Sequence, residues 1–272
     1  MVRVTPVQAL DLPELAPYRT MRRQHKQREE GFFVAEGEKV VRRLIESELE
    51  IVSLLLPEKW FEQYAGVLEK RPEKELPVFL AERNLLEELT GFSFFQGVLA
   101  VARVPKVFTI EEVLTRSVPP RLLLAVDGVS SAENLGGLIR NCVAFGVNAL
   151  LVADNCCSAW LRRSVRSSMG TIFKLPVLEM VNLPDRLSFL RKEGFHLIAA
   201  HAHAEERSVS GADFRKDCVI VLGSEGHGIS QEVLKLCDEE VVIPMQNQVD
   251  SLNVATAGAI FLYEASRQRA KV

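Results

Sequence analysis

A short apolar run near the C-terminus ends in a turn that could bind a ligand. Residues 219–222 (Val-Ile-Val-Leu) are uninterrupted apolar residues, typical of a strand buried on both faces. Gly223, Gly226 and Gly228 follow, with Glu225 between them. Glycines at the carboxyl end of a buried strand let the backbone approach a ligand and leave N–H groups free to bind it. An ordinary tight turn is an equal alternative, because the spacing is neither the dinucleotide fingerprint nor a P-loop.

A second loop of similar size is expected further along the chain. Residues 241–243 form a short apolar strand, which Pro244 stops. A polar loop leads from there into a helix that is apolar over most of its surface. Either Ser251 or Asn253 can cap the start of this helix through a side-chain oxygen. We therefore expect two ligand-sized loops that emerge from neighbouring strands of one sheet.

An arginine in an unusual setting is the third candidate. Residues 122–126 form an apolar strand, and a helix is expected from 135 to 145, with Asn134 at its N-cap and Gly146 just past its end. Arg140 lies nearly two turns inside this helix, among small and apolar residues. An arginine placed there usually needs an anionic partner, which can be a protein carboxylate or a ligand phosphate.

The histidines offer a rival kind of site. His201 and His203 share one face of an expected strand end, with Glu205 nearby. No third ligand follows at helical spacing, so we favour a polar strand end and expect no bound metal. His227, inside the glycine turn, is expected to face solvent.

A cationic run lies near the N-terminus. Residues 19–28 contain no acid and hold five cations: Arg19, Arg22, Arg23, Lys26 and Arg28. Taken alone, the run favours a solvated helix face. The alternative is a phosphate-contacting patch, because cations gathered on one side attract a polyanion. The net charge of -3 means that any such basic surface is local.

Composition limits the class of protein. The chain has 272 residues, 47% hydrophobic and 25% charged, which is ordinary for a globular protein of one large or two medium domains. Its five cysteines form no Cys-x-x-Cys pair, which favours a reducing cytoplasm over a disulfide framework. The N-terminus does not resemble a signal peptide, and no apolar run approaches the length of a membrane span.

The elements that carry these residues predict an α/β protein with two domains. Residues 1–18 are expected to be an extended or short helical lead-in, and alternating strands and helices then give a small α/β domain over 1–104. Prolines around a short helical pattern mark 105–120 as a linker. The second domain spans 121–272, and residues 172–178, broken by Pro176, are expected to form an edge strand.

Three motifs, in order and spacing, resemble those of the SpoU (TrmH-like) family of RNA 2′-O-ribose methyltransferases in the SPOUT superfamily. They cover about residues 121–268: Asn134-x-Gly136-x-x-x-Arg140, Gly223-x-Glu225-x-x-Gly228, and Ile243-Pro-Met245 followed by Ser251-Leu-Asn-Val254. The first hundred residues look like the L30e-like substrate-binding domain of some members, with residues 33–37 (Phe-Val-Ala-Glu-Gly) and 96–100 (Gln-Gly-Val-Leu-Ala) in the expected places.

The resemblance implies a parallel-sheet domain with a deep trefoil knot, an obligate homodimer, and S-adenosylmethionine as cofactor. It implies that backbone around Gly223, Gly228, Ile243 and Leu252 holds the adenosyl portion, while Leu222 and Met245 line the same pocket. The reaction it implies is methyl transfer to a ribose 2′-hydroxyl of structured RNA, with 23S ribosomal RNA favoured over transfer RNA. A non-catalytic RNA-binding module and, most weakly, a nicotinamide dehydrogenase are the alternatives.

The resemblance also distributes roles among the residues. Arg140 is expected to grip the phosphate beside the target ribose, and the family often uses this arginine as the general base. We instead expect it to stabilise the developing alkoxide, because a guanidinium normally stays charged. Glu225 is either the proton acceptor or the partner that orients Arg140 or Asn134. Ser251 and Asn253 are expected to hold the ribose, and the cations of residues 19–28 to bind RNA.

Overall fold

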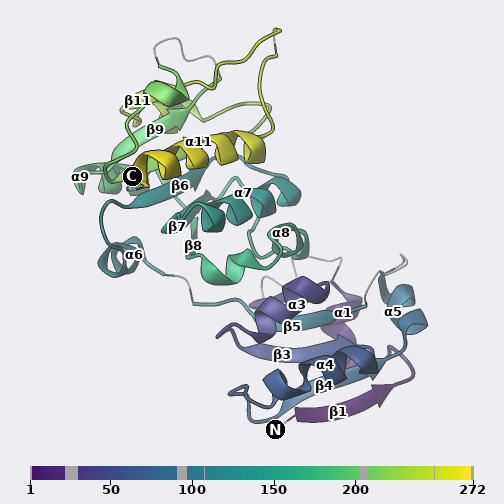
Figure 1. Ribbon diagram of the computed structural model, residues 1–272. Helices are drawn as coiled ribbons and strands as arrows, with labels where there is room; N and C mark the ends of the chain where they lie inside the picture. The colour runs from purple at the N-terminus through teal and green to yellow at the C-terminus, as the bar shows by residue number, and fades with distance from the viewer. Residues whose placement is uncertain are drawn as a thin grey trace. The chain divides into compact units, whose positions relative to one another are not determined.

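The computed structural model describes residues 2–21, 30–90, 97–106, 108–202, 207–247 and 249–270 (Figure 1). The chain divides into two compact units. Unit 1 comprises Met1–Lys106 together with Trp160–Phe173, and unit 2 comprises Val107–Ala159 together with Lys174–Val272. Among the described residues, no helix is both long and apolar enough for a membrane span.

Unit 1 is built on a five-stranded mixed sheet of order β1-β4-β3-β5-β2. Its strands are β1 (Val2–Val7), β2 (Phe32–Glu36), β3 (Ile51–Leu56), β4 (Leu76–Ala81) and β5 (Leu99–Arg103). Its helices include α1 (Ala16–Arg19), α3 (Glu38–Ile45), α4 (Glu58–Leu68) and α5 (Arg83–Thr90). β1 pairs in parallel with β4, so the expected lead-in is instead an edge strand of this sheet. Tyr18 anchors the segment that follows: its ring is fully buried and its hydroxyl shares a 2.8 Å hydrogen bond with Ser53 Oγ.

A segment from the middle of the chain also belongs to unit 1. Its helix α8 (Arg162–Ser167) packs on β2, and the Trp160 ring lies 5.0 Å from that of Phe33. Glu36, at the end of β2, is buried and pairs with the guanidinium groups of Arg162 and Arg166. The predicted second domain, 121–272, is therefore interrupted, because a buried carboxylate and an apolar ring recruit this segment to the first unit.

Unit 2 is built on a six-stranded sheet in which every described pairing is parallel, in the order β11-β9-β10-β6-β7-β8. Its strands are β6 (Leu122–Val126), β7 (Ala149–Ala153), β8 (Val177–Met180), β9 (His196–Ala200), β10 (Cys218–Leu222) and β11 (Glu239–Val241). This confirms the predicted α/β class with a parallel sheet. It corrects one expectation: β10 and β11 are not neighbours, because β9 lies between them.

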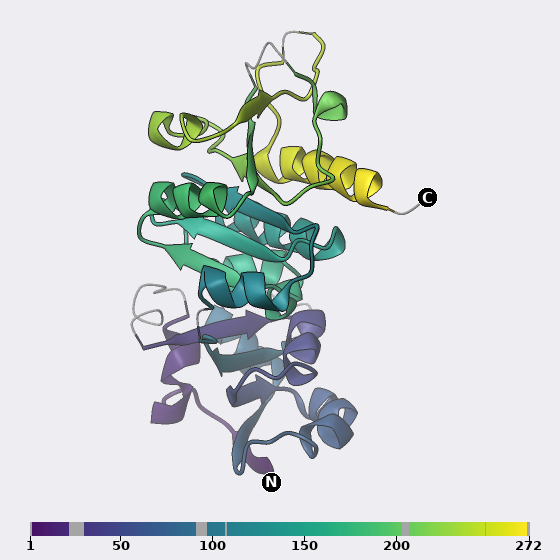
Figure 2. The ribbon, with the colours of Figure 1, turned by 90° about the vertical axis from the view of Figure 1, so that its left-hand side faces the viewer.

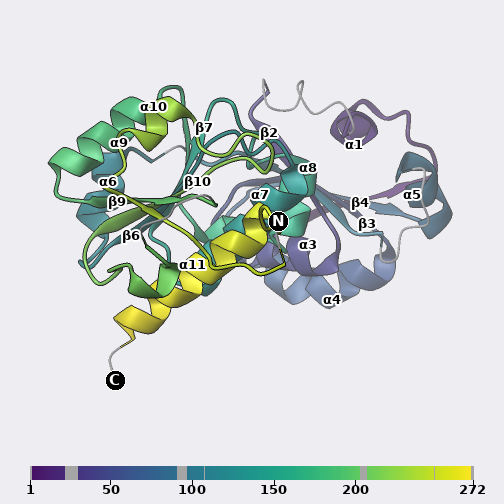
Figure 3. The same ribbon diagram turned by 90° about the horizontal axis from the view of Figure 1, so that it is seen from above.

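Helices cover both faces of the unit 2 sheet, as the continuous apolar strands require. They are α6 (Ile110–Arg116), α7 (Ala132–Ala144), α9 (Leu183–Lys192), α10 (Gln231–Leu234) and α11 (Val254–Arg269). α6, α9 and α10 share one core with the residues of the strands that point to their face. Figure 2 and Figure 3 show α9 and α11 on opposite sides of the sheet. α6 lies within the predicted linker, at the start of unit 2.

α7 and α11 pack closely because small residues face each other. A Cβ on Gly258 of α11 would lie 2.4 Å from Leu138 Cδ2 of α7, so the leucine side chain would have to shift to admit one. A Cβ on Gly137 would lie 3.1 Å from that of Ala255, and Asn141 Nδ2 donates to the Ala255 carbonyl over 2.9 Å. This packing places the first turn of α11 beside the middle of α7.

Candidate active site

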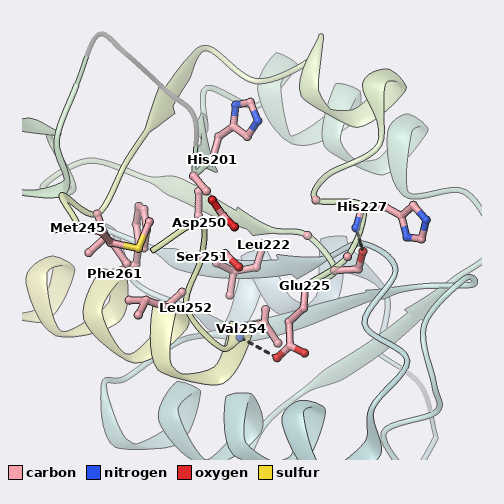
Figure 4. A pocket seen from close by; sticks show the side chains of 18 of the residues that line it. His201, Leu222, Glu225, His227, Met245, Asp250, Ser251, Leu252, Val254 and Phe261 are labelled. Carbon is pink, nitrogen blue, oxygen red and sulfur yellow. Dashed lines mark hydrogen bonds between the residues drawn. The ribbon is translucent and has the colours of Figure 1, made fainter. Parts of the chain in front are cut away.

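A cavity of about 360 Å³ lies at the carboxyl ends of β9, β10 and β11. All six residues predicted to bind the cofactor line it: Leu222, Gly223, Gly228, Ile243, Met245 and Leu252. Glu225 and Ser251 line it too. Figure 4 shows Met245 and Phe261 on one side of the cavity and Glu225 on the other. The two predicted loops therefore meet at one cavity.

The glycine turn forms part of the wall and depends on its first glycine. Ser224 and Gly228 exchange two backbone hydrogen bonds, of 3.0 and 2.9 Å, which close the turn on itself. A Cβ on Gly223 would lie 2.1 Å from the Gly228 carbonyl carbon, a distance no side chain tolerates. Gly228 has a φ of +68°, which favours glycine. The sequence pattern thus reflects a steric requirement of the turn.

Several lining residues were not predicted from the sequence. Ala200, His201 and Ala202 come from the end of β9, and Phe261 comes from the second turn of α11. The three residues at the end of β9 were missed because the prediction placed β10 beside β11, which leaves no room for a third strand end between the two loops. Asp250, in the polar loop, also lines the cavity.

Three predicted catalytic residues meet in one hydrogen-bond network at the cavity. Glu225 Oε1 accepts from Asn134 Nδ2 over 2.9 Å and from Asn253 Nδ2 over 2.7 Å. It also accepts from the Val254 amide over 3.3 Å, and Asn253 Nδ2 donates to Asn134 Oδ1 over 2.9 Å. Because an ionised carboxylate only accepts, the nitrogen of each side-chain amide must face Glu225. The network therefore fixes the orientation of both asparagines.

The caps of the two helices differ in how well the sequence predicts them. Asn253 is the N-cap of α11: its Oδ1 accepts from the Ala255 and Thr256 amides over 3.0 and 3.3 Å. Asn134 is not the N-cap of α7, because Ser131 Oγ accepts from the Asn134 amide instead. The Asn134 side chain therefore does not cap α7, and it bonds to Glu225 instead.

Arg140 is exposed on α7 and forms no ion pair or hydrogen bond with a residue that the structure describes. It lies six residues after Asn134, about 9 Å along the helix axis. The expected setting among apolar side chains is wrong, because Arg140 projects from the exposed flank of the helix. The guanidinium is thus not neutralised by any described carboxylate, and it can meet an external anion.

Among the described residues, acidic side chains line the cavity and basic lysine or arginine side chains do not. Glu225 and Asp250 line it, and no described lysine or arginine does. His201, at its edge, shares a 2.6 Å hydrogen bond between Nδ1 and Glu240 Oε2. His203 and Glu205 of the candidate metal site lie outside the described residues. Within the described ranges, no three His, Cys, Asp or Glu side chains gather as metal ligands.

The predicted RNA-binding run is only partly described. Arg19 ends α1, is exposed, and donates from Nη1 to the Leu12 carbonyl over 2.8 Å and to the Leu10 carbonyl. Arg22, Arg23, Lys26 and Arg28 lie outside the described residues.

Comparisons with known proteins cover most of the chain. Residues 121–263 match the SpoU rRNA Methylase family. An uncharacterized tRNA/rRNA methyltransferase of Mycobacterium tuberculosis is 31% identical over 238 residues, which cover 86% of this chain and 80% of that protein.

Two solved structures are similar over nearly the full length. The SpoU methyltransferase AviRb of Streptomyces viridochromogenes, which has also been solved with its cofactor AdoMet, has a TM-score of 0.79 at 26% identity, covering 93% of this chain and 95% of that one. An RNA 2′-O ribose methyltransferase has a TM-score of 0.77 at 27% identity and covers 99% of both chains.

Proposed function

This chain belongs to the SpoU rRNA methylase family, and from that premise we propose that it transfers a methyl group from S-adenosylmethionine to a ribose 2′-hydroxyl of structured RNA. The observation that carries the proposal is the cavity between the two loops, with the Asn134–Glu225–Asn253 network beside it. A similar structure that acts on the RNA ribose 2′-O position supports the choice of acceptor.

The residues of the cavity fit S-adenosylmethionine. Its apolar walls, among them Leu222, Ile243 and Phe261, suit the adenosyl portion, and the tight turn at Gly223 brings backbone close to a ligand. The acidic lining suits a sulfonium, which is cationic. When bound, the cofactor supplies an activated methyl group.

The side chains around the cavity then act on the RNA. Arg140 binds the phosphate beside the target ribose and stabilises the negative charge that develops on the attacking oxygen. Asn134 keeps one N–H that its contact with Glu225 does not use, and with Ser251 it holds the ribose. Asn253 acts mainly through the network, because its Oδ1 caps α11 and its Nδ2 serves Glu225 and Asn134.

Glu225 is assigned the orienting role, and the proton of the ribose hydroxyl leaves to solvent water as the methyl group bonds to the oxygen. All three of its described hydrogen bonds converge on Oε1, where they set the positions of both asparagine amides and the first turn of α11. A ribose hydroxyl must approach in line with the methyl group, so positioning of this kind is worth a large share of the rate.

The proposal includes the wider architecture implied by the family. Unit 1 acts as an L30e-like RNA-binding domain, the C-terminal segment forms the trefoil knot, and two copies form a dimer. The five cysteines are all free, which suits the cytoplasm.

Ribosomal RNA, and 23S RNA in particular, is the proposed substrate, with transfer RNA as the second candidate because relatives are named tRNA/rRNA methyltransferases. The test is to incubate the protein with methyl-labelled S-adenosylmethionine and either purified 23S RNA or bulk tRNA, and to map the label by alkaline cleavage, which 2′-O-methylation blocks. Label in ribose of 23S RNA is the expected result. Label in tRNA selects the second candidate, label on a base contradicts ribose as the acceptor, and RNA binding without label indicates a non-catalytic protein.

A further inference from the structure

One buried acid joins the ends of three strands beside the site. Asp127 is the first residue after β6 and is 3% exposed. It does not line the cavity, and the proposed mechanism gives it no role. A buried carboxylate needs hydrogen-bond partners, so what it contacts shows what it holds.

The partners of Asp127 come from the loops that follow β7 and β10. Its Oδ2 accepts from the Ser230 amide over 2.8 Å, just past the glycine turn. Its Oδ1 accepts from Asn155 Nδ2 over 2.7 Å, and Asn155 Oδ1 in turn accepts from the Gly128 amide over 2.8 Å. Both carboxylate oxygens of Asp127, and the amide nitrogen and oxygen of Asn155, therefore each have a hydrogen-bond partner.

The loop that Asp127 begins leads into the helix that carries the proposed RNA-contacting residues. It runs to Ser131, which caps α7, and α7 bears Asn134 and Arg140. The same loop lies against the glycine turn, since a Cβ on Gly128 would be 3.4 Å from that of Ser224. The Asp127–Asn155 pair thus holds the RNA-contacting helix in register with the turn that forms the cofactor cavity.

We propose that Asp127 and Asn155 are positioning residues for methyl transfer: their paired side chains fix Asn134 and Arg140 relative to the cofactor turn. This inference rests on the proposed function. Neither side chain touches the reacting groups, so the pair acts on alignment. Misalignment by about 1 Å can cost roughly 100-fold in rate.

Single substitutions create a defined conflict in this pair. In Asp127→Asn, the new side chain has one oxygen for two donors, so its nitrogen faces either the Asn155 amide nitrogen or the Ser230 amide. A flip of Asn155 would only move the first conflict to the Gly128 amide. In Asn155→Asp, two carboxylates face each other over the same short distance. We expect each variant to lose about 100-fold in kcat, with the Kd for S-adenosylmethionine within about threefold of wild type, because the glycine turn keeps its own hydrogen bonds.

The reciprocal swap is the decisive variant. In Asp127→Asn combined with Asn155→Asp, the new asparagine accepts from Ser230 and donates to the new aspartate, which still accepts from Gly128, so every bond returns with reversed polarity. We expect kcat within about fivefold of wild type, which double-mutant analysis reports as coupling. Asn182 and Asp185 form the matched control: this exposed pair on α9 has a 2.8 Å bond of the same type, and swapping it should leave kcat unchanged.

Amide hydrogen exchange provides a readout that does not depend on activity. Gly128 should exchange at least tenfold faster in Asp127→Asn and return to the wild-type rate in the swap. If the single variants do not fold, Asn155→Ala tests the same bonds without facing like groups. Wild-type kcat in folded single variants, or a swap that restores exchange but not turnover, overturns the inference. A wild-type protein that methylates no RNA while its exchange pattern follows the prediction instead overturns the proposed function.

Discussion

At the scale of single residues, Arg140 gives the clearest test of the mechanism. It is exposed, has no described partner and does not line the cavity, so its removal should leave the cofactor site intact. We expect Arg140→Ala to lower kcat by about 100- to 1,000-fold, because a donor aimed at developing charge is lost. The Kd for S-adenosylmethionine, measured by calorimetry, should change by less than about threefold. Equal losses in turnover and cofactor affinity would contradict the role assigned to Arg140.

Arg140→Lys sharpens this test. Lysine keeps the positive charge but cannot make the two parallel hydrogen bonds that a guanidinium makes to a phosphate. Partial recovery of kcat relative to Arg140→Ala is therefore expected. Full recovery would mean that charge alone suffices.

Glu225 allows orientation to be separated from proton transfer. Its three described hydrogen bonds all end on Oε1, so the carbonyl oxygen of a glutamine can accept each of them. We expect Glu225→Gln to keep kcat within about tenfold of wild type, since neutral hydrogen bonds are weaker but remain. Glu225→Ala should lose about 100-fold, because both asparagine amides lose their anchor. Equal loss in the two variants would instead identify Glu225 as the proton acceptor.

At the scale of elements, the glycine turn offers a matched pair of substitutions. A Cβ on Gly223 would lie 2.1 Å from the backbone of Gly228, whereas a Cβ on Gly226 meets nothing within 4 Å. Gly223→Ala should therefore open the turn and raise the Kd for S-adenosylmethionine at least tenfold, an effect of about 1.4 kcal/mol or more. Gly226→Ala should bind like wild type. Similar affinity in both variants would show that the cofactor does not need the closed turn.

Strands could be predicted from the sequence where a continuous apolar run marks them. The strands of unit 2 are rich in apolar residues, and β6 and β10 were found within a residue of their bounds. β1 was missed because Arg3, Thr5 and Pro6 interrupt it, and because its partner β4 is far away in sequence. Strand order was also out of reach, since nothing local indicates that β9 lies between β10 and β11.

The site residues, like the strands, could be predicted only where the signal is local in the sequence. The lining residues on the two loops could be predicted because glycines and polar residues interrupt apolar runs there. The contact between Asn134 and Glu225 was expected only as one alternative, because these residues are 91 positions apart and their contact depends on how α7 lies beside the glycine turn. The capping error has a local cause: Ser131 and Asn134 are both good capping residues, and only the backbone decides between them.

At the scale of the whole molecule, one ion cluster ties distant parts of the chain into unit 1. Glu36 is buried and pairs with Arg162, which is 126 residues away, and with Arg166. Because Arg162 has only 15% exposure, Glu36→Ala leaves a largely buried cation unpaired and should lower the free energy of unfolding by about 3 kcal/mol. Urea titration measures this. The control is Glu46→Ala, whose partner Arg42 is 63% exposed, and we expect it to change stability by less than about 1 kcal/mol.

Residues 160–173 belong to unit 1 but lie within the sequence of unit 2, and this predicts how fragments of the chain behave. A fragment of residues 107–272 contains every described residue that lines the cavity, but it lacks β2, on which Trp160 and α8 pack. We expect this fragment to aggregate in isolation, because it exposes Trp160 and an unpaired Arg162. Co-expression with residues 1–106 should restore solubility through a one-to-one complex, since β2 again covers the segment. The Glu36→Ala substitution in the shorter fragment should weaken that complex in size-exclusion chromatography. A fragment 107–272 that is as soluble and as heat-stable as the full chain would show that residues 160–173 do not depend on unit 1.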